Sequence, residues 1–405
     1  MALCLRLSDS PHNIGSSDPD TMERTLDLES DKPVPGMWRF PTHRDLCCIY
    51  RVPNSMRREN PEAYTPQMVL IGPLHHSLKY QAHKSRGDIT KANSMAYLNM
   101  EEHKKIYLAE FAKRVEGKKT IDGFRKIIEE DETIIRATYS ESTAWIESPE
   151  FVEMILHDSV FIIEFIMRTS VMPTTRIGDP LVDEIFLART VRRDLMLLEN
   201  QLPYFVLNKL FDPVLKILNP NKTFRQLVIK CLPLETLPYH CFGEFKGRQH
   251  MYSAEKLHSG GVKFKAAGRY PFSLYVKFVD GCLKIPTLIV DEDAEITLRN
   301  IMAFEQCHCR DNPHVCNYVL FFKFLIDTEK DVEFLVQKDI IKNRIGNHGS
   351  VATMVNKLCL GVIDFGSYHS MIESDVNAHY KSRYKKALVI LKRVYTTIFG
   401  ELPTP

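Results

Sequence analysis

The sequence predicts a mainly α-helical, multi-helix globular protein with a small antiparallel β insert around residues 262–290. Apolar residues recur at helical spacing over much of the chain after residue 91, which is typical of amphipathic helices. Within the insert the spacing changes to strand-like alternation. Hydrophobic residues make up 44% and charged residues 26% of the 405 residues, a balance typical of globular proteins rather than disordered or fibrous ones.

The overall charge and the cysteine pattern exclude several classes of protein. The 53 Lys and Arg residues nearly balance the 51 Asp and Glu residues, so we expect no nucleic-acid partner. The ten cysteines are scattered, and the N-terminus lacks a signal-peptide core, which together indicate a reducing compartment. No stretch approaches the ~18 uncharged apolar residues of a membrane span. The sequence therefore predicts a cytoplasmic protein or one peripheral to the plasma membrane.

The first 40 residues differ in composition from the rest of the chain. They contain seven acidic and four basic residues among clustered Ser, Pro, Asp and Gly, which indicates a flexible acidic arm at 1–40. Order is expected to begin near Leu46. Residues 46–398 are predicted to form one large helical domain that includes the β insert, followed by a short tail at 399–405.

The first part of this domain is predicted to be helical after one short strand. Val69-Leu70-Ile71 indicates a strand that ends at a Gly72-Pro73 turn, and an amphipathic helical pattern begins at Lys91. Ser148-Pro149-Glu150 is typical of a helix start with proline in the first turn. It precedes Phe151–Met167, which is apolar on nearly all sides and therefore predicts a central buried helix.

The second part of the domain contains the irregular and strand-like stretches. A helix is predicted over Leu181–Leu202, and residues 212–262, with several prolines, indicate an irregular connection. Residues 273–285 predict a hairpin with a type I′ turn at Asp280-Gly281, and residues 288–290 a short third strand. Helices are predicted again from Ala294 onward, over Tyr318–Ile326 and Val351–Leu360, and over 376–398.

A cluster of thiols and imidazoles lies between Glu305 and Cys316. Three cysteines and two histidines in twelve residues are a candidate zinc site, with Cys307, Cys309, His314 and Cys316 as the possible ligands. Zinc knuckles place at least two residues between paired cysteines, but here one residue separates the first pair, and no second knuckle follows. The alternative is a helix end at Asn312-Pro313 with buried cysteines. We therefore predict no metal and no cofactor.

Charged side chains on apolar helix faces are the strongest site candidates. Arg192 and Glu199 would lie about 20° apart on one helix face, beside Arg193 and Asp194. Asp158 and Glu164 lie on the apolar 151–167 helix and are natural partners for Arg192 or Arg193. An unpaired buried charge costs several kcal/mol, so a structural ion-pair network is the interpretation we favour. The alternative is a general acid or base whose pKa is changed by burial.

The last predicted helix is basic, with no acidic residue between 376 and 398. Such a helix can bind an anionic membrane surface or an acidic partner. Its apolar stripe, from Tyr380 to Ile398, favours instead a helix packed on the core with a solvated basic side. The candidate contact residues are Lys381, Arg383, Lys385, Lys386, Lys392 and Arg393.

Several strings of this sequence, in this order, resemble the plant family known as domain of unknown function 247. They are Ile71-Gly72-Pro73-Leu74-His75-His76, Met100-Glu101-Glu102-His103-Lys104, Met154–Asp158, Phe161–Glu164, Val191–Leu195, Leu198–Pro203, Leu283–Pro286 and Phe304–His308. The likeness covers about residues 46–395. Its most specific part is the string from Arg192-Arg193-Asp194 to Glu199-Asn200-Gln201.

The resemblance implies a mostly helical plant protein with no established enzymatic activity and no catalytic residues to transfer. Members of the family commonly finish with a hydrophobic anchor, which implies placement at a membrane. This sequence instead ends in Ile398-Phe399-Gly400-Glu401-Leu402-Pro403-Thr404-Pro405. The resemblance therefore leaves two alternatives, a shortened chain or a soluble member whose basic last helix can touch a membrane.

Some grass members of the family resemble the pollen determinants of self-incompatibility, and the Ile49–Pro53 string is similar to grass versions. A recognition or signalling role with an unidentified protein partner is therefore the leading hypothesis, and it predicts variable exposed surface within 212–262. One alternative is a soluble enzyme that uses Asp158, Glu164, Glu199 and the pair His75-His76. Another alternative is a peripheral membrane scaffold that docks through 376–398.

Overall fold

A computed structural model describes residues 34–39, 44–85, 93–115, 117–170, 178–218, 223–231, 246–267, 274–309 and 313–399. The chain divides into two compact units, residues 1–234 and 235–405. Almost all of the predicted acidic arm, and the predicted tail after Phe399, lie outside the described residues. The described chain is mostly helical with few strands, so the predicted fold class is confirmed.

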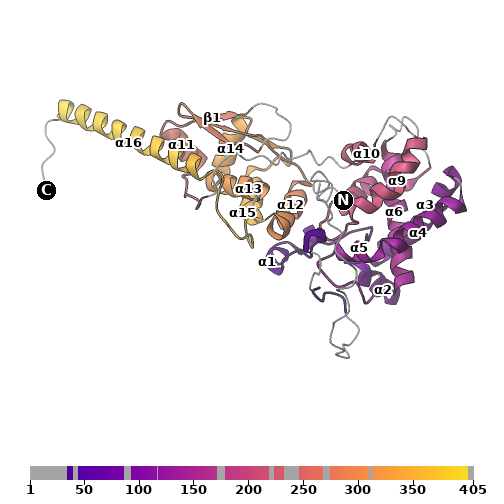
Figure 1. Ribbon diagram of the computed structural model, residues 1–405. Coiled ribbons are helices and arrows are strands. Elements are labelled where there is room, and N and C mark those ends of the chain that lie inside the picture. The colour runs from indigo at the N-terminus through magenta and orange to yellow at the C-terminus, as the bar shows by residue number, and fades with distance from the viewer. Residues whose placement is uncertain are drawn as a thin grey trace, which may run out of the picture. The chain divides into compact units, whose positions relative to one another are not determined.

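The first unit consists of helices connected by turns and extended segments (Figure 1). Its elements are η3 (Arg44–Leu46), α1 (Asn54–Arg57), η4 (Pro61–Tyr64), α2 (His76–Lys84), α3 (Ser94–Arg114), α4 (Lys118–Glu130), α5 (Glu132–Ala137), α6 (Ser148–Ser170), α7 (Pro180–Asp183), α8 (Ile185–Asp194), α9 (Tyr204–Leu218) and α10 (Phe224–Cys231).

Helix α6 is the centre of the first unit. It packs against α3, α4, α9 and α10, and its apolar residues from Phe151 to Ile166 are buried on nearly every side. The predicted central helix is therefore confirmed. Because α6 is surrounded by other helices, its acidic residues Asp158 and Glu164 are buried as well, and each needs a partner.

The second unit combines helices with two small sheets. Its elements are α11 (Ala254–Ser259), β1 (Lys263–Ala266), β2 (Lys277–Val279), β3 (Cys282–Ile285), β4 (Leu288–Val290), α12 (Ala294–His308), α13 (His314–Leu325), α14 (Glu329–Gln337), β5 (Ile341–Asn343), α15 (His348–Leu358) and α16 (Ser370–Phe399).

The β insert is mixed rather than purely antiparallel. Strands β2 and β3 form the predicted hairpin, and positive φ angles at Asp280 (50°) and Gly281 (72°) confirm its type I′ turn. Strand β1 adds to the other edge of β3 in parallel, and β4 pairs in parallel with the distant β5 in a second sheet. Turn residues predict a hairpin locally, but partners that are distant in sequence are chosen by packing, which is why the purely antiparallel prediction was wrong.

Helix α16 contacts the rest of the second unit over its first half. Val376 and Tyr380 are buried, and α16 packs against β2. Farther along, apolar side chains that were expected to reach the core are exposed, among them Leu388, Leu391 and Tyr395. The predicted packing of the whole apolar stripe is therefore wrong for these three residues. Among the described residues, no helix has both the length and the apolar composition needed to cross a membrane.

Candidate functional site

Asp194, the last residue of helix α8, binds the backbone of the extended segment at residues 67–69. The carboxylate of Asp194 accepts hydrogen bonds from the backbone N–H groups of Gln67 (2.9 Å), Met68 (2.7 Å) and Val69 (2.9 Å). Burial raises the pKa of Asp194 to about 6, although the three N–H donors favour the charged form. The predicted strand at 69–71 is not a strand, because its N–H groups bond to side chains instead of to a neighbouring strand.

After the end of α8, the amide side chains of Asn200 and Gln201 form hydrogen bonds with the backbone. Asn200 accepts the N–H of Ile71 (2.7 Å) through Oδ1 and donates through Nδ2 to the carbonyl of Asp194 (3.0 Å). Gln201 donates to the carbonyls of Leu195 (2.8 Å) and Leu197 (2.7 Å). These bonds hold residues 195–201 in a turn after the helix, and one of them goes to the carbonyl of Asp194, the last helical residue. The prediction of one helix over 181–202 was therefore wrong, and the helix ends at Asp194.

Glu199 is the acceptor at the centre of a buried ion network. Its carboxylate lies 2.8 Å from Arg51 Nη1, bonds Arg57 and accepts the N–H of Val52 (2.7 Å). His75 Nε2 lies 3.3 Å from the same carboxylate. Burial, together with the charges of Arg51 and Arg57, lowers the pKa of His75 to about 3, so this imidazole is neutral at physiological pH.

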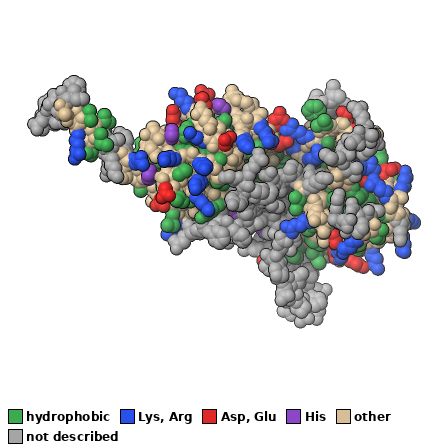
Figure 2. Space-filling view, turned by 90° about the horizontal axis from the view of Figure 1, so that it is seen from above, with side chains coloured by type: hydrophobic (Ala, Val, Ile, Leu, Met, Phe, Trp, Pro, Cys, Tyr) green, Lys and Arg blue, Asp and Glu red, His purple; other side chains and the backbone are tan. Residues whose placement is uncertain are grey.

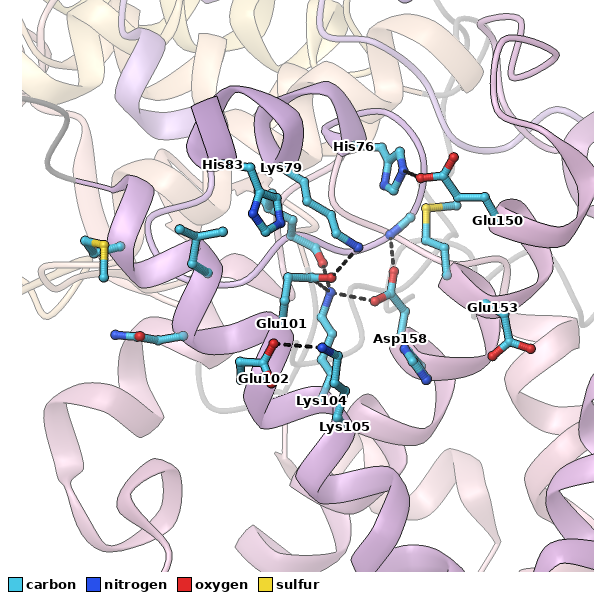
Figure 3. A pocket seen from close by; sticks show the side chains of 17 residues that line it. His76, Lys79, His83, Glu101, Glu102, Lys104, Lys105, Glu150, Glu153 and Asp158 are labelled. Atoms are coloured by element: carbon cyan, nitrogen blue, oxygen red, sulfur yellow. Dashed lines mark hydrogen bonds and ion pairs between the residues drawn. The ribbon is translucent and has the colours of Figure 1, made fainter. Parts of the chain in front are cut away.

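A second buried network surrounds Lys104 on helix α3. Its ammonium lies 2.6 Å from Asp158 Oδ1 and 2.5 Å from Glu101 Oε1, and donates to the carbonyl of Leu70 (2.6 Å). Burial alone would lower the pKa of Lys104, but the two carboxylates outweigh burial and raise it. The N–H of Gly72 donates to the other oxygen of Asp158 (2.8 Å). Figure 3 shows Lys104 between Glu101 and Asp158.

These groups form the floor of a cavity of about 350 Å³ between α2, α3 and α6. Its wall contains a further ion pair between Lys79 and Glu101 (2.7 Å) and a hydrogen bond between His76 Nε2 and Glu150 Oε1 (3.0 Å) (Figure 3). The volume suits a small ligand. Lys79, Glu101, Lys104 and Asp158, however, each already have a partner of opposite charge, so a ligand that binds one of them would compete with an existing ion pair.

Glu164 belongs to a third group at the end of α6. Its carboxylate binds Arg114 (2.6 Å) and Arg168 (3.1 Å), and Arg168 continues to Asp179 (2.9 Å). Burial raises the pKa of Glu164 even though both arginines favour its charged form. Tyr107 donates to Asp179 (2.8 Å) and completes the group.

The predicted partners of Arg192 and Arg193 were wrong. Asp158 and Glu164 bind residues of α3 and α6 instead, because α8 presents Asp194, and not its arginines, to the buried interior. The guanidinium of Arg192 faces the ring of Phe165 at 5.9 Å. The positive charge of Arg193 favours the charged form of Asp194 and so lowers its pKa, against the larger effect of burial.

The thiol and imidazole cluster of the second unit has a structural explanation. Glu305 of α12 accepts the N–H groups of Val315 (2.9 Å) and Cys316 (2.8 Å), so it caps the N-terminal end of α13. The buried Cys316 thiol lies 3.7 Å from the carbonyl of Met302, and burial raises its pKa. Within the described part of the chain, no group of three His, Cys, Asp or Glu side chains is arranged to hold a metal ion, Cys307, Cys309 and His314 included.

The second half of α16 is an exposed apolar and basic surface. Six apolar side chains here have exposed fractions between 45% and 64%: Leu388, Val389, Ile390, Leu391, Val394 and Tyr395. The candidate residues Lys381, Arg383 and Arg393 are exposed on the same helix. Lys385, Lys386 and Lys392 lie on it too, with side chains outside the described set.

Sequence reasoning missed the basic partners of the buried acids. Lys104 follows Tyr97 and Met100 and precedes Tyr107 and Phe111 at helical spacing, so a lysine within an apolar stripe was the available signal. Arg51 carried no such signal, because it lies in an irregular segment whose neighbours are determined by tertiary packing.

Comparison with known proteins identifies relatives from a plant. The chain is 26% identical over 412 aligned residues to UPF0481 protein At3g47200 of Arabidopsis thaliana, which covers 88% of this chain and 82% of that protein. It is 29% identical over 147 residues to the putative UPF0481 protein At3g02645 of the same plant, covering 35% of this chain and 27% of that protein. No solved structure matches the chain.

Residues 49–238 and 242–398 match the plant family DUF247, described as plant protein of unknown function. The matched residues include all the buried networks described above. The strings of this sequence from Arg192 to Gln201 and from Ile71 to His76 thus have a structural role: they supply donors and acceptors that hold the first unit together. The chain belongs to the DUF247 family of plant proteins.

Proposed function

We propose that this chain is a recognition or signalling protein without enzymatic activity that works at an anionic membrane surface. The second half of α16 lies on that surface. The single observation that supports this proposal is the exposed apolar and basic surface of α16. A packed helix would bury its apolar stripe, whereas an interfacial helix keeps the stripe free for lipid.

Five of the six exposed apolar positions occupy one side of α16, and the sixth, Val389, lies among the basic positions on the other side. At about 100° per residue, Ile390, Val394, Leu391, Tyr395 and Leu388 fall within an arc of about 160°. Basic positions fall in the complementary arc: Lys385, Lys386, Lys392 and Arg393. This division is typical of helices that lie in the plane of a membrane interface, with the apolar side toward the acyl chains and the basic side at the headgroups.

Charge adds a specific preference for anionic lipid. No acidic residue occurs between 376 and 399. Each Lys or Arg near an anionic membrane surface contributes about 1 kcal/mol, so the four basic positions contribute roughly 4 kcal/mol at low salt. A second copy of the same helix would place like charges together, which makes an anionic surface the better occupant.

Ion pairing gives the buried acids a structural role that needs no catalysis. Asp158, Glu164 and Glu199 each engage at least one positively charged partner within 3.1 Å and lie away from solvent. A general acid or base needs access to a substrate proton. These acids instead stabilise the first unit.

The test is sedimentation of the full chain with phosphatidylcholine vesicles that contain phosphatidylserine. We expect binding that weakens with salt and falls at least tenfold when Lys385, Lys386, Lys392 and Arg393 are changed to Gln. The control removes as many charges from exposed positions of the first unit: Lys105, Lys113, Lys126 and Lys216. Equal binding of both variants and the unchanged chain would overturn the proposal.

A pollen recognition role is a narrower form of this proposal. Its test is purification of the tagged chain from pollen and from stigma-treated pollen, followed by mass spectrometry of co-purifying proteins. A protein enriched only after stigma contact is the expected result. Recovery of the chain alone from both samples would contradict the narrower form and leave membrane docking intact.

A further inference from the structure

The solvent-exposed face of the three-stranded sheet has a row of lysines. In the order β1-β3-β2, Lys265 pairs with Lys284 and Lys284 pairs with Lys277, so one lysine of each strand lies in the same row. Lys263 lies two residues before Lys265 on the same face of β1, and all four lysines are exposed. We call Lys263, Lys265, Lys277 and Lys284 the lysine row.

The register of the row is set by the opposite face of the sheet. Phe264 and Leu283 are buried, and they pair across β1 and β3. Because successive side chains alternate between the two faces, burial of these residues places the neighbouring lysines outward. The row is therefore held on a rigid element rather than on a loop.

Such a row destabilises the free protein. Side chains directly opposite each other on adjacent strands lie roughly 4.5–5.5 Å apart at Cβ, and like charges at that spacing repel. Among the described residues, no carboxylate forms an ion pair with any lysine of the row. The ammonium of Lys277 lies 4.9 Å from the ring centre of Tyr275, a contact that leaves its charge in place.

Protection of sheet edges explains only part of the row. Exposed lysines on edge strands prevent unwanted pairing with other strands. This accounts for lysines on β1 and β2, which are the edges of the sheet. Lys284 lies on the central strand β3, between two other lysines, where there is no edge to protect.

The sheet adjoins the first half of α16. Tyr380 lies against Gly260, Arg383 against Gly261 and His379 against Gly281, so α16 contacts the end of the sheet where β1 and β3 begin. Gly261 is two residues before Lys263. The exposed Arg383 of α16 thus lies near the start of β1, while His379 contacts Phe278 on the sheet face opposite the lysine row. Figure 2 shows Lys and Arg side chains, interspersed with acidic and His side chains, on the part of the second unit next to α16.

We propose that the lysine row binds the phosphate groups of a multiply phosphorylated inositol lipid in the membrane on which α16 lies. Phosphate monoesters carry a charge of about −1.5 to −2, so two of them match the charge of the row. Lysine binds phosphate as a point charge with rotatable donors, which suits phosphates on different ring positions. The inference rests on the proposed function, because α16 brings the row to the membrane.

The test compares two vesicle preparations of equal total negative charge. One contains phosphatidylserine only, and the other replaces part of it with phosphatidylinositol 4,5-bisphosphate. We expect the full chain to bind the second about tenfold more tightly, and the variant with Lys265, Lys277 and Lys284 changed to Gln to bind both equally. The control variant changes Lys330, Lys338 and Lys357, exposed lysines of the same unit, and should keep the preference.

Thermal unfolding separates a binding effect from a folding effect. Since the row repels itself, the triple variant should unfold at the same temperature as the unchanged chain or at a higher one. A lower temperature would contradict the argument that the row is a cost to stability. No preference of the unchanged chain for the bisphosphate vesicles would overturn the inference and leave docking through α16 standing.

Titration with soluble inositol 1,4,5-trisphosphate distinguishes the failure of this inference from the failure of the proposed function. If the chain bound no vesicles at all, docking through α16 would be wrong. Binding of the soluble headgroup by the unchanged chain, and its loss in the triple variant, would then still support phosphate recognition by the row. No binding of the soluble headgroup in that case would overturn the inference as well.

Discussion

Replacing Lys104 with Met tests whether the buried ion network stabilises the first unit. At 2.6 Å from Asp158 and an effective dielectric constant near 20, the two charges attract by about 6 kcal/mol before desolvation is counted. Removal of one partner of a buried pair typically costs about 3–5 kcal/mol, because the other charge stays buried. We expect Lys104→Met to lower the free energy of unfolding by that amount.

A double substitution isolates the pair. Asp158→Asn keeps an oxygen that can accept the N–H of Gly72 and removes the negative charge. Combined with Lys104→Met, it should recover about 2 kcal/mol relative to Lys104→Met alone. The neighbouring Lys105, exposed and paired with Glu102, is the matched control: Lys105→Met should change stability by less than about 0.5 kcal/mol.

Urea unfolding followed by tryptophan fluorescence is the appropriate assay. The chain has two tryptophans, Trp38 and Trp145, and both lie in the first unit, so the signal reports that unit alone. Trp145 packs 5.9 Å from the ring of His76, close to the network. A cost below about 1 kcal/mol for Lys104→Met, or a double variant as unstable as the sum of the single ones, would refute the reasoning.

Three further predictions concern the same unit and use the same fluorescence assay. Glu199→Ala should cost about 3–5 kcal/mol, because it removes the buried carboxylate that pairs with Arg57 and one of the two that pair with Arg51. Arg192→Ala, which loses a ring contact, should cost about 1 kcal/mol or less, and equal costs would contradict this. Gly72→Ala should destabilise the first unit more than Gly117→Ala. Both glycines have positive φ, but a Cβ at Gly72 would lie 2.6 Å from the backbone oxygen of Gln201, whereas a Cβ at Gly117 would meet nothing within 4 Å. Equal effects of the two substitutions would exclude the clash. His75 accepts a proton near pH 6.5 in the unfolded chain but only near pH 3 in the folded one. Its contribution to the free energy of unfolding is therefore complete above pH 6.5 and is lost as the pH falls toward 3, by up to about 1.4 kcal/mol per pH unit. This dependence of stability on pH should be weaker in His75→Asn, and an unchanged dependence would contradict the argument.

The helices were predictable because their signals are local. The 151–167 segment is apolar on nearly all sides, and such a segment can only be stable in a core, whatever surrounds it. The hairpin turn at Asp280-Gly281 was equally predictable, because two consecutive residues that tolerate positive φ favour a type I′ turn. Both features follow from interactions between residues close in sequence.

The candidate site was predicted only in part. Asp158, Glu164 and Glu199 are buried ion-pair residues, as the charges on apolar faces indicated, but their partners come from Lys104, Arg114 and Arg51. Nothing in the spacing of Arg51 distinguishes it from a solvated arginine. The end of α8 was missed for a related reason, since the turn that follows it is held by bonds from the amides of Asn200 and Gln201, which depend on their folded positions.

The sequence by itself therefore determined the mainly helical class, the central helix, the hairpin turn and the basic, partly apolar character of residues 376–398. Only the tertiary structure decided which Lys or Arg side chain forms an ion pair with which buried acid, and that β1 joins β3 in parallel. It also decided that lysines of three strands form one row and that apolar side chains in the second half of α16 are exposed. The physical reason is the separation in sequence over which each interaction acts. Backbone propensity and apolar periodicity act within a few residues, whereas a buried charge and a strand edge accept whichever partner packing places beside them.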